Sequence, residues 1–185
     1  MKKILVFLTV CLMAMPAMAT LNVRGVDLPT SITLEEDTLV LNGAGTRRRA
    51  MMNLYVGALY LQEKNSNATA IINADASMSI RLHITSGMIT RERMLDAINE
   101  GFEAATGGNT APIQTQIDIL NGFFSDEIKE GDLIELAYTP TRGVIMSKNG
   151  ATRGSIEGLD FKKALFAIWL GDKPADNRLK RDMLN

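Results

Sequence analysis

The sequence predicts an α+β fold in which helices pack on one side of a large, mainly antiparallel sheet. The first observation is the order of hydrophobic patterns, which runs from strands to two helices, back to strands and then to a last helix. That order is typical of α+β proteins. The second observation is size, because 185 residues, 46% of them hydrophobic, suffice for one ordinary domain with its own core.

Residues 1–19 have the pattern of a secretory signal peptide. Two lysines precede an uncharged apolar run over residues 4–15, and Ala17-Met18-Ala19 is a small-x-small cleavage site. The run is shorter than the ~20 residues of a permanent membrane span, and Cys11 lacks the preceding small residue of a lipoprotein signal. We therefore expect cleavage near Ala19, no membrane anchor afterwards, a periplasmic or secreted location and a single domain over residues 20–185.

The charge and the ligand-forming residues exclude several functions. Removing 19 of the 185 residues leaves 166, with 18 basic and 21 acidic side chains, a net charge of −3 and no cysteine. Proteins that bind nucleic acids usually have a basic excess, so we expect no nucleic-acid partner. A zinc or other transition-metal site needs clustered imidazole or thiolate ligands, which one histidine cannot supply. We expect no metal and no cofactor.

Two glycine-containing motifs do not fit the chemistry that they resemble. Gly43-Ala44-Gly45 lacks the third glycine of a dinucleotide fingerprint, and a strand rather than a helix follows it. The string Gly154-Ser155-Ile156-Glu157-Gly158 does not have the order of a serine-hydrolase elbow. We interpret both as turns.

Strands are predicted first along the chain. Leu39–Leu41 is apolar, Asn42–Gly45 has turn chemistry, and Arg47–Leu61 is rich in β-branched, aromatic and methionine residues. We expect a hairpin whose glycines adopt positive φ at the turn. From Leu54 to Leu61 both alternate sets of residues are largely apolar, which predicts a strand covered on both faces. Met78–Ile84 alternates apolar with polar residues, as in a half-buried strand.

Two helices are predicted in the middle of the chain. Thr90 is the expected N-cap of the first helix, which Gly107-Gly108 ends. Its apolar stripe consists of Met94, Leu95, Ile98 and Phe102. Thr110 is the expected N-cap of the second helix, with Pro112 in its first turn. Its apolar face consists of Ile113, Ile117, Leu120 and Phe124.

Three strands and a closing helix complete the prediction. The strands are expected over Asp132–Tyr138, Val144–Ser147 and Thr152–Ile156, with a hairpin turn at Asn149-Gly150 between the last two. The closing helix ends at Gly171. Its apolar set consists of Phe161, Ala164, Leu165, Ile168 and Trp169.

Three consecutive arginines precede the predicted buried strand. Burying a guanidinium without a partner costs several kcal/mol, so at least one arginine is expected to face a cleft or the protein interior. Strand alternation places Arg47, Arg49 and Tyr55 on one side and Arg48 on the other. A solvated strand end is one interpretation, and recognition of an anion by a guanidinium and a Tyr hydroxyl is the other. In a straight strand Arg47 and Tyr55 would be ~26 Å apart, so they converge only if the strand bends, bulges or folds back at the arginine.

The sequence resembles the bacterial secreted branch of the chalcone isomerase-like proteins, and the resemblance covers roughly residues 21–184. Three blocks carry it in order: Gly43-Ala-Gly-x-Arg47 with Tyr55-Val-Gly-Ala-Leu-Tyr-Leu61; Gly131-Asp132 with Tyr138-x-Pro140-x-x-Gly143; and Ile156-x-Gly158-x-x-Phe161 with Ile168-Trp-Leu-Gly171. The resemblance implies an open-faced sandwich, in which helices cover one face of a large antiparallel sheet, with a ligand cleft between the two layers.

The resemblance also implies which residues bind a ligand. The arginine of the plant isomerases corresponds to Arg47, their strand threonine to Tyr55, and their helix asparagine lies near Asn99, whereas their tyrosine and lysine have no counterparts. Most of the catalytic set is thus missing, and flavonoid cyclisation is not expected. The non-catalytic members resemble fatty-acid binders in which an arginine and a tyrosine hold the carboxylate, and Arg47 and Tyr55 match that pair.

Three functional hypotheses remain open. The preferred one is a non-catalytic periplasmic protein that binds an amphipathic small molecule, such as a fatty or other organic acid, through Arg47 and Tyr55. His83, the only histidine, is a further candidate ligand-binding residue, at the edge of the cleft, and Asn99 is another. The second hypothesis is an isomerase or lyase acting on an enone-type or carbonyl substrate, with His83 or Tyr55 as acid or base. The third is an interaction protein without a ligand. The oligomeric state is not predicted.

Overall fold

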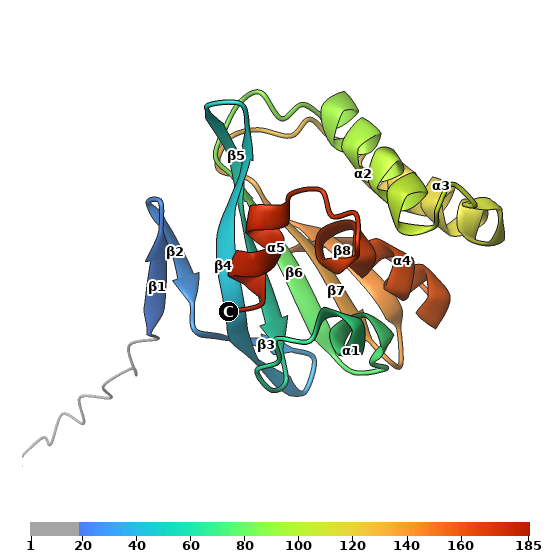
Figure 1. Ribbon diagram of the computed structural model, residues 1–185, viewed down its shortest axis with the longest axis horizontal. Coiled ribbons are helices and arrows are strands. Elements are labelled where there is room, and N and C mark those ends of the chain that lie inside the picture. The colour runs from blue at the N-terminus through green and yellow to red at the C-terminus, as the bar shows by residue number, and fades with distance from the viewer. Residues whose placement is uncertain (1–18) are drawn as a thin grey trace, which may run out of the picture.

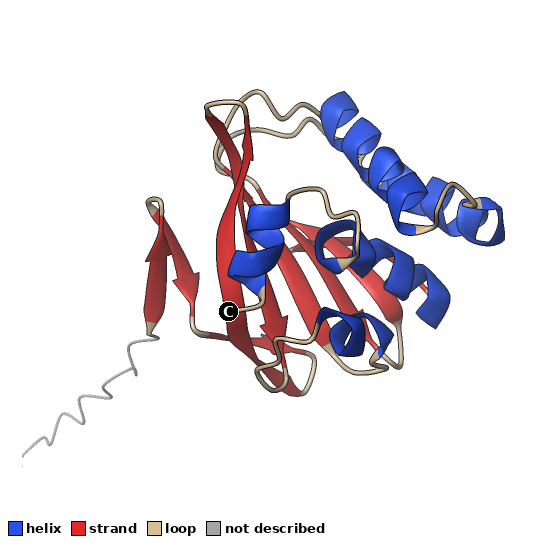
Figure 2. Ribbon diagram, in the orientation of Figure 1, coloured by secondary structure: helices blue, strands red, loops and turns tan. Residues whose placement is uncertain are grey.

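A curled, seven-stranded antiparallel sheet forms the centre of the computed structural model, which describes residues 19–185 (Figure 1). The predicted signal peptide lies, apart from Ala19, outside the described residues. The strands of the sheet follow one another in chain order from β3 to β9, and Figure 2 shows the helices gathered on one side. The predicted α+β class with helices on one face of the sheet is confirmed.

The elements have the following bounds. The strands are β1 (Thr20–Val23), β2 (Val26–Pro29), β3 (Ser31–Leu34), β4 (Asp37–Arg49), β5 (Met52–Leu61), β6 (Met78–Ile84), β7 (Leu133–Thr139), β8 (Gly143–Lys148) and β9 (Ala151–Ile156). The helices are α1 (Ala68–Asn73), α2 (Arg91–Ala105), α3 (Gln114–Phe123) after a 3₁₀ turn (Ala111–Ile113), α4 (Leu159–Leu170) and α5 (Asn177–Met183).

The first long hairpin does not turn where the sequence predicted. Residues 42–45 lie inside β4, and the chain reverses at Ala50 and Met51, with Ala50 at a φ of 54°. The segment Arg47–Leu61 is therefore not one strand but the end of β4, a turn and β5. The prediction was wrong because glycine usually marks a turn, whereas Gly43 and Gly45 serve a different purpose.

These glycines let the backbone of α5 lie directly on β4. A Cβ atom added at Gly43 would lie 2.4 Å from the carbonyl oxygen of Asp182, and one at Gly45 would lie 2.5 Å from the Asp182 side chain. Just before them, Asn42 forms a bulge in β4, and its side-chain amide donates to the carbonyl of Met183 over 2.8 Å. The close contact between α5 and β4 thus requires glycine at positions 43 and 45, because any side chain there would collide with the helix.

The predicted burial of β5 on both faces is confirmed, and two apolar clusters cover it. The larger cluster lies between the sheet and the helices and includes Tyr55, Leu59 and Leu61. The smaller one lies on the outer face and packs Val56, Ala58 and Tyr60 beneath the segment from β2 to β4. The hydroxyl of Tyr60 donates to the carbonyl of Pro29 over 3.0 Å, which attaches the β1–β2 hairpin to this face.

The helix caps match the prediction in one case and not in the other. Thr90 caps α2, since its hydroxyl accepts from the backbone N–H of Arg93, whereas Thr110 makes no capping hydrogen bond. Pro112 places a 3₁₀ turn at this point, and the Thr110 hydroxyl instead donates to the Gln114 side chain. The predicted turn at Asn149-Gly150 is confirmed, with both residues at positive φ.

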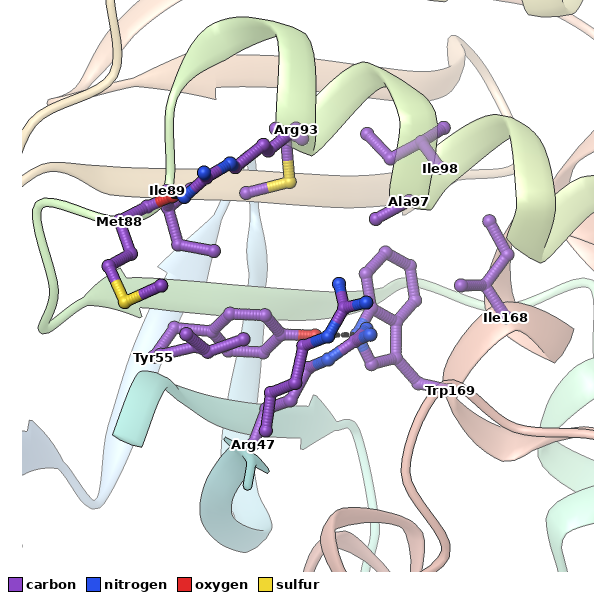
Figure 3. Close-up of a pocket in the computed structure, with 12 residues that line it drawn as sticks. Arg47, Tyr55, Met88, Ile89, Arg93, Ala97, Ile98, Ile168 and Trp169 are labelled. Atoms are coloured by element: carbon purple, nitrogen blue, oxygen red, sulfur yellow. Dashed lines mark hydrogen bonds between the residues drawn. The ribbon is translucent and has the colours of Figure 1, made fainter. Parts of the chain in front are cut away.

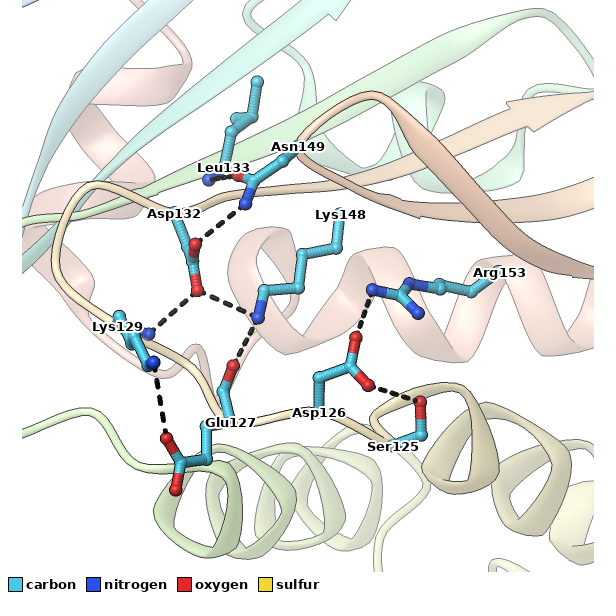
Figure 4. A network of polar contacts seen from close by, with 9 residues as sticks. All are labelled: Ser125, Asp126, Glu127, Lys129, Asp132, Leu133, Lys148, Asn149 and Arg153. Carbon is cyan, nitrogen blue, oxygen red and sulfur yellow. Dashed lines mark hydrogen bonds and ion pairs between the residues drawn. The ribbon is translucent and has the colours of Figure 1, made fainter.

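A polar network fixes the loop between α3 and β7 to the β8–β9 turn (Figure 4). The Asp132 carboxylate accepts from the Asn149 side chain, from the backbone N–H of Lys129 and from Lys148 Nζ, at 2.8, 2.8 and 3.0 Å. Arg153 pairs with Asp126 in the same loop. The loop is therefore held in one position beside the sheet.

Lys162 is fully buried, and its ammonium group lies at the C-terminal end of α1. Its Nζ donates to the carbonyls of Ile71, Ile72 and Ala74 at 3.0, 2.9 and 2.7 Å. A cation is favoured at this end of a helix, where backbone carbonyls lack partners. Burial nevertheless lowers the pKa of Lys162 to about 8.

Substituting Gly43→Ala should lower the free energy of unfolding by about 1–3 kcal/mol, because the added methyl group meets the backbone of α5. The matched control is Gly122→Ala in α3, where a Cβ atom meets nothing within 4 Å. There, the better helix propensity of alanine should raise stability by up to ~1 kcal/mol. Urea denaturation measures both. Equal effects at the two positions would contradict the close approach of α5 to β4.

Lys162 should make stability rise between about pH 8 and the unfolded-state pKa of 10.5. Across this range the unfolded chain still binds the proton that the folded protein has released, so higher pH favours folding. Relative to Lys162→Met, the wild-type protein should gain up to about 3 kcal/mol over this interval. The measurement is the difference in unfolding free energy between the two proteins as a function of pH. A difference that does not change with pH would contradict the lowered pKa.

Candidate functional site

A pocket of about 360 Å³ lies between the β4–β5 hairpin, the start of α2 and the C-terminal half of α4 (Figure 3). Its lining combines cationic and apolar side chains. These are Arg47, Arg49, Leu54, Tyr55, Met88, Ile89, Arg93, Met94, Ala97, Ile98, Ile168 and Trp169. The exposed members, Arg49, Met88 and Arg93, mark its mouth, and most of the others are buried. The volume is within the ~300–1,000 Å³ typical of small-molecule sites.

The hairpin turn at Ala50 and Met51 brings Arg47 opposite Tyr55. The two are partners in the β4–β5 register, and the guanidinium carbon of Arg47 lies 5.9 Å from the centre of the Tyr55 ring. The register then shifts between Arg47 and Arg48, which leaves Leu54 as an extra residue in β5. Leu54 and Tyr55, although consecutive, therefore both line the pocket. Arg47 and Tyr55 come together because the chain folds back just beyond Arg47.

The Tyr55 hydroxyl is held by Trp169 of α4. The indole N–H donates to it over 2.9 Å, and both side chains are buried (Figure 3). A phenol can accept one hydrogen bond and still donate its own proton. Among residues 19–185 that proton has no acceptor. The Trp169 contact thus leaves Tyr55 oriented as a donor in the pocket wall.

Three arginines lie around this pocket, and none forms an ion pair with a carboxylate of the described residues. Arg47 is half-buried, whereas Arg49 and Arg93 are exposed. Arg93 Nη1 donates to the carbonyl of Met88 over 2.9 Å, which ties the first turn of α2 to the preceding loop. Arg48 is exposed and is not part of the lining. The carboxylate of Asp176, which caps α5, is near enough for the Arg47 charge to help lower its pKa, but it forms no ion pair with Arg47. The lining itself therefore carries three positive charges and no negative one.

The remaining wall is apolar. Leu54 belongs to β5, Ile89 to the loop before α2, Met94 and Ile98 to α2, and Ile168 to α4. All five are buried. A cationic mouth leading to such a wall suits a molecule with an anionic head and an apolar tail.

His83 lies on the opposite face of the sheet from the pocket. It pairs with Val56, which belongs to the outer apolar cluster. Burial, followed by the nearby Arg81 guanidinium, lowers the pKa of His83 below its usual value, and no partner within the described chain satisfies its Nε2 atom. The structure therefore does not bring His83 together with Arg47 and Tyr55.

Asn99 lies on α2 but faces α3. Its Oδ1 accepts from the side-chain amide of Asn121 over 3.1 Å, and it does not line the pocket. The pocket side of α2 instead presents Arg93, Met94, Ala97 and Ile98. Of the four predicted site residues, the structure thus places two in the pocket.

Trp169 and Arg93 line the pocket but were not predicted as parts of the site. Trp169 was interpreted as a core residue of its helix, and nothing in its own segment pointed to Tyr55. Arg93 could have been noticed, because a cation in the first turn of a helix is unfavourable for the helix dipole, which suggests a role outside the helix. Arg49 had been placed on the same side as Arg47 by strand alternation alone.

Among residues 19–185, no three His, Cys, Asp or Glu side chains gather in a way that could hold a metal ion. None of the helices in the same range has the length and apolar character needed to cross a membrane.

Comparison with known proteins identifies the family. The model of the chalcone isomerase-like family matches residues 19–185. Among solved structures, the chain is similar to a fatty-acid binding protein from Arabidopsis thaliana, with a TM-score of 0.73 and 18% sequence identity, over 90% of this chain and 96% of the plant chain. No curated protein matches the sequence. The strand order, the helices on one face of the sheet and the family match over nearly the whole chain together show that this protein belongs to the chalcone isomerase-like family.

Proposed function

We propose that this protein binds an amphipathic organic acid, such as a fatty acid, without transforming it. The carboxylate would lie between the Arg47 guanidinium and the Tyr55 hydroxyl, and the tail would lie against the apolar wall formed by α2 and α4. One observation carries the proposal. A half-buried arginine without an ion pair in the described chain lies beside a phenol whose proton has no acceptor there, in a pocket whose buried wall is apolar.

The chemistry of the two groups supports a carboxylate ligand. A guanidinium donates two parallel hydrogen bonds to a carboxylate, and such charge-assisted bonds are about twice as strong as neutral ones. The buried surroundings of Arg47 and Tyr55 strengthen the attraction by reducing the screening by water. The similar plant structure is that of a fatty-acid binding protein, which agrees with a small lipid ligand.

The two other hypotheses receive less support. A protein without a ligand would be expected to fill the space between sheet and helices, whereas a pocket of about 360 Å³ is present there. An isomerase would be expected to bring a helix asparagine to the substrate, whereas Asn99 is engaged with Asn121 outside the pocket. The binding hypothesis uses the residues that do meet there.

We also propose that residues 1–19 are a signal peptide and that the mature protein acts in the periplasm or outside the cell. The basic start, the apolar run and the Ala17-Met18-Ala19 site support this location. The family match begins at residue 19, which agrees with this division of the chain.

Substituting Arg47→Gln should weaken the binding of dodecanoate by about 10- to 100-fold, the equivalent of the ~1.5–3 kcal/mol of a charged hydrogen bond. The melting temperature should stay nearly unchanged, because Arg47 forms no ion pair within the described chain. Isothermal calorimetry with dodecanoate, and with the uncharged dodecanol, measures the effect. Arg48→Gln is the matched control, since this arginine does not line the pocket.

The head-group assignment fails under either of two results. One is an equal loss of affinity for dodecanoate and dodecanol in Arg47→Gln, which would mean that the arginine shapes the pocket rather than binding the carboxylate. The other is unchanged binding of dodecanoate. Tyr55→Phe is a less clean test, because it would also leave the buried Trp169 N–H without its acceptor.

The tail assignment predicts that Ala97→Phe, which extends a side chain into the pocket, shortens the ligand that fits. Displacing two or three methylene groups, at ~0.8 kcal/mol each, should weaken dodecanoate binding about 30-fold and leave butanoate binding unchanged. Ala104→Phe, on the same helix but outside the lining, is the control. Affinities for a series of chain lengths provide the measurement. A uniform loss for short and long acids would place the tail elsewhere.

A further inference from the structure

The β4–β5 hairpin projects beyond the rest of the sheet. Pairing of β5 with β6 begins only at Tyr55, so residues 48–53 have no third strand beside them. Figure 1 shows the end of this hairpin at the edge of the molecule, close to the loop that leads into α2. The two segments flank the pocket mouth, since Arg49 of the hairpin and Met88 of the loop both line it.

This end of the molecule exposes large apolar side chains. Met51 is 91% exposed, Met52 45% and Met88 40%. Within the described chain only two other large apolar side chains are comparably exposed, Leu21 and Ile119. Methionine is unbranched and flexible, and it adapts to irregular apolar surroundings. We refer to Arg48, Arg49, Met51, Met52, Met88 and Arg93 together as the mouth surface.

The mouth surface is cationic in a chain that is otherwise acidic. Arg48, Arg49 and Arg93 are exposed, and none is paired with a carboxylate of residues 19–185. The expected mature chain, in contrast, has a net charge of −3. The positive charge is therefore local.

Carboxylates in the neighbouring segments already accept hydrogen bonds or form ion pairs. Asp176 accepts from the backbone N–H groups of Arg48, Arg178 and Leu179, where it caps α5. Glu92, beside Arg93, pairs with Arg91. In the loop before β7, Asp126 pairs with Arg153 and Glu127 with Lys129 (Figure 4).

We propose that the mouth surface docks on an anionic phospholipid bilayer. The guanidinium groups would contact lipid phosphates, and the three methionines would enter the boundary between head groups and acyl chains. Interfacial binding of this kind adds apolar burial to electrostatic attraction for anionic lipids. The charge complementarity and the isolated, flexible apolar side chains fit a fluid lipid surface. In this orientation the pocket mouth faces the membrane, so that an amphiphile could pass from one to the other without crossing bulk water.

The test is flotation of the purified protein with two kinds of vesicle, phosphatidylcholine alone and phosphatidylcholine mixed with phosphatidylglycerol. Binding should be at least about tenfold tighter to the anionic vesicles and should weaken as salt is raised. The double substitution Met51→Ser with Met52→Ser should reduce this binding about tenfold. Arg48→Gln with Arg49→Gln should do the same. Ile119→Ser is the matched control, because this side chain is 44% exposed but lies on α3, outside the mouth surface.

Several results would overturn the docking proposal: no binding to anionic vesicles at low salt, equal binding to both kinds of vesicle, or an equal loss in Ile119→Ser and the methionine variant. Dodecanoate binding without vesicles keeps the two proposals separate. The methionine variant should keep its affinity for dodecanoate, because neither Met51 nor Met52 lines the pocket. If it loses vesicle binding and dodecanoate binding together, its effect is not specific to docking and the proposal fails.

Discussion

The pairing register of β4 and β5 determines almost everything that distinguishes this protein. It places Arg47 opposite Tyr55 and leaves Leu54 as an extra residue in the pocket wall. A slip of one residue would turn each of these side chains to the other face of the sheet. Arg47 would then lie on the outer face of the sheet, away from the pocket. The bulge at Asn42, whose side chain bonds to α5 and to the loop after β5, helps to fix the register.

The middle of β4 packs against a helix, whereas its C-terminal end contributes to the pocket. Where Gly43 and Gly45 face the helices, α5 lies directly on the strand and leaves no space. Two residues further along, the same face carries Arg47, and there a pocket opens between the sheet, α2 and α4. Gly43, Gly45 and Arg47 occupy alternate positions of β4, so that one face of a single strand packs against a helix and also contributes to the pocket.

Much of the fold could be predicted because its signals are local. Examples are the alternation of Met78–Ile84, the cap at Thr90 and the turn at Asn149-Gly150. The hairpin was misplaced because Gly43 and Gly45 are required by α5, which lies about 140 residues away in sequence, while the true turn has an alanine at positive φ. In the site, the arginines beside a buried strand indicated anion binding, and the family resemblance assigned it to Arg47 and Tyr55. Trp169 could not be predicted because no local pattern shows how its helix packs on Tyr55, and the unfavourable position of Arg93 at a helix start did not say what it faces. His83 lies on the outer face of the sheet, away from the pocket.

The hydrogen bond between Trp169 and Tyr55 has one more consequence. Trp169 is the only tryptophan in the sequence, and its indole ring lines the pocket while its N–H is bonded to the phenol beside Arg47. Ultraviolet emission from the whole protein therefore originates largely at a single place, next to the groups that would receive an anion. The molecule contains its own optical reporter, and occupancy of the pocket can be followed without attaching a dye.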